Sequence, residues 1–186
     1  MIMIIRDIGF GGIRGMNADE LEELVISTVQ ETQVKLGPAD GSESLYLPLT
    51  SLESDGDVEA VRKLMEEFQK KAAPHLGMVD YTIMQDRVRI VIPEKGTKYV
   101  SSLPVSPVLV TMVDSVSKHL SLDQLKTRLE SEFGDCTWKD VDGDGFRCIA
   151  YFDRTDPNVY CIGSECGHLI YHRFNRKDYS EFGYGM

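Results

Sequence analysis

The residues whose types and spacing are best suited to chemistry lie near the end of the sequence. Cys161 and Cys166 flank Gly163-Ser164, a pair with the form of a two-residue hairpin turn. In that register the two thiols face each other, and alternation along the strand places His168 and His172 on the face of Cys166. Thiolates and imidazoles are preferred zinc ligands. We therefore predict that these two cysteines and two histidines are the candidate ligands of a zinc site.

The spacing Cys161-x4-Cys166-x-His168 differs from the Cys-x2-Cys spacing of common zinc sites, so two alternatives stay open. The cysteines can be a reduced pair packed in the core, or a redox-active pair. With zinc, a bound water would supply hydrolytic chemistry, and without it an activated thiolate would supply transfer chemistry. A zinc- or thiol-dependent enzyme with its site on a C-terminal sheet is therefore one hypothesis.

The other two cysteines have a simpler interpretation. If Asp142-Gly143 forms a hairpin turn, Cys136 lies opposite Cys148, and Cys148 shares a face with apolar residues. We expect both to be buried and to act as small hydrophobic side chains. The run from Asp140 to Gly145 matches the first half of a calcium loop, but position 12 of that loop is Tyr151. An acidic turn is therefore the prediction there.

A glycine-rich turn near the N-terminus could bind an anion. It follows the apolar strand Met1–Ile8 and precedes a helix, as phosphate-binding loops do. The candidate cofactor-binding residues are Gly11, Gly12 and Arg14. The spacing is not Gly-x-Gly-x-x-Gly and no P-loop lysine follows, so a flexible turn is the alternative. No nucleophile elbow, HExxH or kinase motif occurs, and the sequence leaves enzymatic activity undecided.

Four helices are expected to support these residues. Asn17 with Glu20, and Ser121 with Gln124, have the spacing of capping boxes and predict two helix starts. A further helix should begin at Ser54-Asp55-Gly56 and end at Pro74. The predicted helices cover 17–36, 54–73, 108–120 and 121–133.

The remaining segments alternate as strands do, and most of them form hairpins. Gln85-Asp86 should turn one strand back on another, and Pro48 predicts that its strand lies at a sheet edge. We therefore predict an α+β fold with mainly antiparallel sheet covered by about four helices. After the first strand, the predicted strands are Leu45–Leu52, Tyr81–Met84, Arg87–Ile92, Thr97–Leu103, Thr137–Val141, Phe146–Phe152, Val159–Ile162 and Cys166–Phe174.

A junction at Pro104 and Pro107 divides the chain into an N-terminal module, 1–103, and a C-terminal module, 104–186, which could also form one compact domain. Lys63–Phe68 and Arg128–Phe133 are similar helix ends, and each precedes predicted strands. This similarity suggests that a helix followed by three strands is used twice.

The charge balance limits the partners. With 30 acidic and 20 basic residues among 186, the net charge is −10, which disfavours nucleic acid and anionic membranes. No stretch reaches the ~20 apolar residues of a membrane helix, and no signal peptide is evident, so we expect a cytoplasmic protein. The leading hypothesis is a non-enzymatic module that binds a small molecule or a protein, including a second copy of itself.

Overall fold

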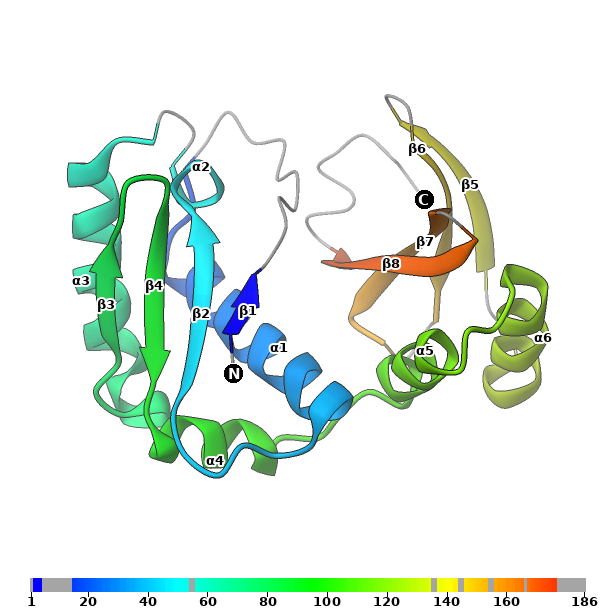
Figure 1. Cartoon of the computed structure of the whole chain (residues 1–186), viewed down its shortest axis with the longest axis horizontal. Coiled ribbons are helices and arrows are strands. Elements are labelled where there is room, and N and C mark those ends of the chain that lie inside the picture. The colour runs from blue at the N-terminus through cyan, green and yellow to red at the C-terminus, as the bar shows by residue number, and fades with distance from the viewer. Residues whose placement is uncertain are drawn as a thin grey trace. The chain divides into compact units, whose positions relative to one another are not determined.

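The computed structural model describes residues 2–4, 15–53, 56–134, 137–143, 146–153, 156–165 and 167–176 (Figure 1). These residues form six helices and two sheets, which confirms the predicted α+β class. The chain divides into two compact units, Met1–Pro104 and Val105–Met186, so the division lies beside the proline junction.

The N-terminal unit has a four-stranded sheet of order β1-β2-β4-β3. Strands β2 (Glu43–Pro48), β4 (Arg87–Ile92) and β3 (Asp80–Ile83) are antiparallel, and the short β1 (Ile2–Ile4) pairs in parallel with β2. The β3–β4 hairpin around Gln85-Asp86 confirms the prediction. β2 is not an edge strand, because Pro48 is its last residue and β1 pairs with its middle.

Two long helices cover one face of this sheet. Helices α1 (Ala18–Leu36) and α3 (Val58–Leu76) lie behind it in Figure 1. The predicted capping box opens α1, since Asn17 accepts from the Glu20 N–H and Glu20 accepts from the Asn17 N–H. The buried residues between the helices and the sheet include Leu21, Val25, Val29, Leu45, Leu47, Val61, Met65, Phe68, Val88, Ile90 and Ile92.

The prediction that Thr97–Leu103 is a strand is wrong. This segment belongs to helix α4 (Glu94–Ser102), in which Thr97 and Val100 are buried and Lys98 pairs with Glu94 one turn away. Gly96 permits the close packing, since a Cβ there would lie 2.6 Å from the Leu76 carbonyl oxygen. Packing of one helical face thus outweighs the β-branched residues in the segment.

Two other boundaries differ from the prediction. Helix α3 begins after its cap Asp57 and continues through Pro74, because Leu76 beyond the proline is buried in the core. The segment after Pro48 is a short helix, α2 (Leu49–Leu52), whose two leucines are buried. In both places burial of a leucine decided the backbone conformation.

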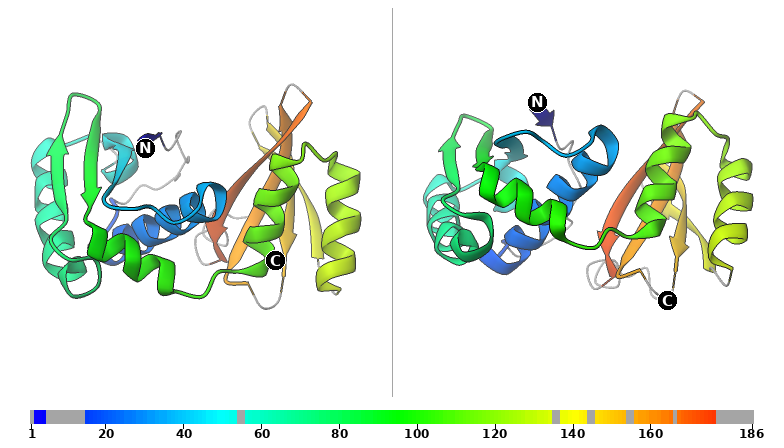
Figure 2. Two further views of the ribbon diagram at one scale, coloured as in Figure 1. Left: turned by 60° about the horizontal axis from the view of Figure 1, so that its bottom comes forward. Right: turned by 90° about the horizontal axis from the view of Figure 1, so that it is seen from below.

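The C-terminal unit is a meander covered by two helices. Strands β5 (Thr137–Gly143), β6 (Phe146–Phe152), β7 (Asn158–Glu165) and β8 (His168–Asn175) pair antiparallel in sequence order. Helices α5 (Pro107–Ser117) and α6 (Leu122–Phe133) lie beside this sheet (Figure 2). The second capping box, at Ser121 and Gln124, and the end of α6 at Gly134 are both as predicted.

The suggested use of one module twice is not supported. In the N-terminal unit, helix α3 leads to two strands and then to helix α4, whereas in the C-terminal unit helix α6 leads to four strands. The two sheets also differ in strand order. In the part of the chain that the structure describes, no single helix is long and apolar enough to cross a membrane; only α4 and α5 counted together, across the break between them, reach that length and composition.

Candidate functional site

The register of the C-terminal sheet places Cys161 opposite His172 and leaves His168 farther along β8. Gly163 and Ser164 lie within β7, and the hairpin turn follows Glu165 and includes Gly167, which has a φ of +80°. Cys161 is therefore opposite His172, not Cys166, and the predicted register is wrong. Gly167 adopts this left-handed conformation without strain, so it permits a turn at that position. Cys166 itself lies outside the described residues.

His168 is the first residue of β8, where it lies opposite Glu165. Its ring lies edge-on to His119, with 5.5 Å between ring centroids, and His119 has a φ of +54° in the connection between α5 and α6. A strand rises about 3.3 Å per residue, so His168 and His172 are roughly 13 Å apart along β8. Among the described residues, no three His, Cys, Asp or Glu side chains gather in a group that could hold a metal ion.

The remaining sequence candidates do not form a described site. Cys148 pairs with Val141, so the expected pairing with Cys136 is wrong by register, and Cys136 lies outside the described residues. Gly11, Gly12 and Arg14 also lie outside them. The anion-binding turn therefore stays a prediction.

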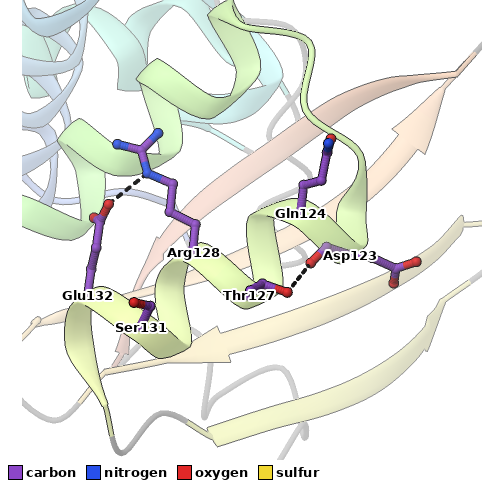
Figure 3. A pocket seen from close by; sticks show the side chains of 6 residues that line it. All are labelled: Asp123, Gln124, Thr127, Arg128, Ser131 and Glu132. Atoms are coloured by element: carbon purple, nitrogen blue, oxygen red, sulfur yellow. Dashed lines mark hydrogen bonds and ion pairs between the residues drawn. The ribbon is translucent and has the colours of Figure 1, made fainter.

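A polar groove of about 470 Å³ runs along α6 (Figure 3). Arg128 lies in the middle of it, where its Nε donates to Glu132 at 2.7 Å and its Nη1 donates to Asp114 of α5 at 2.5 Å. The other lining residues are Asp123, Gln124, Thr127 and Ser131.

Arg128 and Glu132, two of the three charged side chains that line this groove, are paired with each other. Hydrogen bonds from Arg128 and, to a smaller extent, from Thr111 hold the pKa of Glu132 below its usual range. Hydrogen bonds from Lys118 and, to a smaller extent, from Arg128 lower the pKa of Asp114. Because the guanidinium is occupied on two sides, the network joins α5 to α6 and leaves little charge for a ligand.

Asp156 is the most fully hydrogen-bonded carboxylate of the C-terminal unit, and it is 4% exposed. Its Oδ1 accepts from the backbone and side-chain nitrogens of Asn158 at 2.8 and 2.9 Å. Its Oδ2 accepts from the Tyr160 hydroxyl at 2.9 Å and from Ser106, the N-cap of α5. Burial and, to a smaller extent, the negative charge of Asp156 raise the pKa of Tyr160. The phenol therefore keeps its proton and donates it in the hydrogen bond. The cluster fixes the start of α5 to β7.

Glu43 is the contrasting carboxyl of the N-terminal unit. It points to the helix side of β2 and is 5% exposed, and its Oε1 has no hydrogen-bond partner in the described part of the chain. Burial raises the pKa of Glu43, and a hydrogen bond from Gln33 opposes this. Gln33 is itself bound to Thr97 and Ser101 of α4. This carboxyl therefore costs stability when it is ionised.

The outer side of β3 carries backbone groups that no other strand of the described residues pairs with. β3 is the last strand of its sheet, at the left in Figure 1, and within the described residues no strand lies beyond it. The Met84 N–H donates to the Arg87 carbonyl at 2.8 Å, so the peptide groups of Met84 point toward β4. Alternation along an antiparallel ladder then directs those of Thr82 inward and those of Tyr81 and Ile83 outward.

Both ends of β3 are held in place. At its start, Gln69 of α3 donates to the Val79 carbonyl at 2.6 Å. At the hairpin turn, Arg87 makes two bonds to the Asp86 carboxylate, at 2.8 and 2.5 Å, and lowers the pKa of Asp86. The Leu49 N–H donates to the Asp86 carbonyl at 3.0 Å. Contacts within the chain therefore hold β3 in its extended conformation.

Two exposed methionines flank this strand. Met78 is 91% exposed and Met84 is 48% exposed, whereas Tyr81 and Ile83 are half-buried against the core. Asp80 is the one charged residue of β3. Sequence reasoning found the hairpin but not the free edge, because strand order depends on pairing between distant segments. The absence of proline and lysine from Asp80–Ile83 was the available signal.

No curated protein and no solved structure is significantly similar to the chain. One family matches residues 18–183, which include most of both units, and its description reads "Domain of unknown function, E. rectale Gene description (DUF3877)". Since the match covers most of the sequence, this chain belongs to the DUF3877 family.

Proposed function

We propose that the chain is a non-enzymatic protein-interaction module that binds an extended segment of its partner as an additional strand along β3. The observation that carries the proposal is the free outer side of β3, where the peptide groups of Tyr81 and Ile83 point away from β4. Strand addition to a sheet edge uses such groups for affinity and the adjoining side chains for specificity.

Three further features support this function. The contacts of Gln69 and of Arg87 hold β3 in an extended conformation, which lowers the conformational entropy lost on binding. Met78 and Met84 supply flexible apolar surface at its two ends. Edge strands that must not pair commonly carry lysine, proline or several charges, and β3 has only Asp80.

The alternative of a zinc- or thiol-dependent enzyme has less support. It depends on Cys166, which lies outside the described residues. His168 and His172 are four residues apart on β8, or roughly 13 Å along the strand. We therefore place the function on the N-terminal sheet and not on the C-terminal one.

The test is selection of ten-residue peptides displayed on phage against the whole chain. Ile83→Pro removes one outward N–H and leaves the β3–β4 ladder intact, while Ile83→Ala keeps the N–H and removes the side chain. We expect selected peptides to bind the native chain and the alanine variant and to lose most of their affinity for the proline variant. Equal binding to all three would refute the proposal, as would failure to select any peptide. Tyr81→Pro is the substitute if Ile83→Pro does not fold.

A further inference from the structure

We infer that the strand received by β3 is β3 of a second copy of this chain, paired antiparallel about Tyr81. This inference rests on the proposed function and names the partner of the same edge. It is carried by the self-complementarity of the segment Met78–Met84 and by the charges of the adjacent helix α3.

The backbone of β3 permits this pairing. A two-fold axis through Tyr81 places the two Tyr81 residues opposite each other, and the peptide groups of both point outward, as a hydrogen-bonded pair requires. The next such pair joins Val79, just before β3, to Ile83 of the second copy; the Val79 N–H donates there, while the Val79 carbonyl also accepts from Gln69. The resulting ladder would merge the two four-stranded sheets into one continuous sheet.

The side chains also match in this register. Met78, which is 91% exposed, lies opposite Met84 of the second copy, so the two exposed methionines beside β3 cover each other. Asp80 lies opposite Thr82 of the second copy and avoids a second carboxylate. The two Tyr81 rings meet on the helix side of the sheet, where aromatic pairs across strands are stabilising.

Helix α3 adds charge complementarity. Lys71 pairs with Asp19 and His75 with Glu22, so this side of α3 faces α1. Gln69 is on the other side, toward β3, and the helical repeat places Arg62 and Glu66 in the same row as Gln69. Both of these residues are exposed, and Arg62 also pairs with Glu59 of its own helix at 3.5 Å.

The position of this row along β3 follows from the contact between Gln69 and Val79. Tyr81 is two residues beyond Val79, or about 7 Å along the strand, and roughly four to five residues of helix span the same length. Helix α3 runs antiparallel to β3, so counting back from Gln69 by that number places the two-fold axis at the level of Leu64, between Arg62 and Glu66. Each arginine then faces the glutamate of the second copy.

The experiment is sedimentation equilibrium of the whole chain over a roughly hundredfold range of concentration. We expect a monomer–dimer equilibrium that Arg62→Glu and Glu66→Arg each weaken about tenfold, since each change creates two like-charge contacts by symmetry. Mixing the two variants should restore affinity, because both contacts in the mixed dimer are attractive. Glu67→Arg, the same charge change on a different exposed side of α3, should leave the affinity unchanged.

A chain that stays monomeric at every concentration would overturn the inference, and so would variants that weaken the dimer without restoring it on mixing. In either case, displayed peptides that bind the native chain but not Ile83→Pro would still support strand addition by a different partner. If the proline variant binds every selected peptide as well as the native chain does, the proposed function fails together with the inference. The charge reversals are at exposed positions, so folding is not in question for them.

Discussion

β3 and β5, one outer strand from each sheet, differ in how they are protected from pairing. β3 has one charged residue, Asp80, in its four positions, whereas β5 carries Lys139, Asp140 and Asp142 in seven. Charged side chains on an edge strand disfavour the approach of another strand. The comparison indicates that the C-terminal sheet is protected at β5 and that the N-terminal sheet is open at β3, where we place the interaction.

A similar contrast appears between two of the buried carboxyls. Asp156 of the C-terminal unit accepts four hydrogen bonds, whereas Glu43 of the N-terminal unit has an oxygen without a described partner. A fully bonded buried carboxylate stabilises its surroundings, and an incompletely bonded one costs stability. The Asp156 carboxylate therefore stabilises the C-terminal unit, whereas an ionised Glu43 costs the N-terminal unit stability.

The largest effect is expected from Asp156→Ala. The change leaves the donors of Ser106, Asn158 and Tyr160 without an acceptor, so the free energy of unfolding should fall by about 3 kcal/mol. Urea unfolding followed by tryptophan fluorescence measures this, because Trp138 belongs to the same unit. Asp156→Asn keeps one acceptor and should cost less. A loss below about 1 kcal/mol would show that the cluster is not an anchor.

The next effect concerns the register at β3. Thr82→Glu places a carboxylate opposite Asp80 of the second copy, twice by symmetry, and should weaken the dimer about tenfold. Thr82→Lys places an ammonium group there and should keep or raise the affinity. Sedimentation equilibrium compares them. If both variants weaken the dimer equally, Asp80 is not opposite Thr82 and the register about Tyr81 is wrong.

Glu43→Gln should stabilise the chain by about 1 kcal/mol at neutral pH, because it removes a buried charge with an unpartnered oxygen. The folded-state pKa of Glu43 is raised, so its cost appears as the pH rises above the ordinary value of a glutamate and is absent below about pH 4. The gain from the substitution should shrink accordingly on acidification.

Glu22→Gln is the matched control for this change. Glu22 is also buried, but its Oε1 lies 3.2 Å from His75 Nδ1, so the substitution should not stabilise the chain. Thermal unfolding of both variants across the acidic range provides the measurement. A Glu43→Gln variant that is less stable than the native chain at neutral pH would contradict the interpretation.

The smallest effect is expected at the hairpin turn. Arg87→Ala removes the hydrogen bonds that lower the pKa of Asp86, so this pKa should rise toward the ordinary aspartate value. NMR titration of the carboxyl resonance measures the change. Arg89→Ala is the control, because that guanidinium donates to Ser44 and not to Asp86. An unchanged Asp86 pKa in the Arg87 variant would mean that the turn is not held by this pair.

Local signals in the sequence predicted much of the secondary structure. The capping boxes at Asn17 and Ser121 work through atoms three residues apart, and the Gln85-Asp86 turn joins adjacent strands, so these could be read without tertiary structure. The segment Thr97–Leu103 could not be read in this way. Its helical form depends on packing of Val100 and Gly96 against distant residues.

The sequence by itself determined the α+β class and the β3–β4 hairpin, because periodicity and turn residues are local properties. Only the tertiary structure decided that Cys161 lies opposite His172, that Asp156 is surrounded by donors, and that β3 is an outer strand. Register and strand order depend on which distant segments bury their apolar side chains against each other. A shift of one residue in register moves every side chain of a strand to the other face of the sheet. The candidate interaction surface is therefore a property of the assembled sheet.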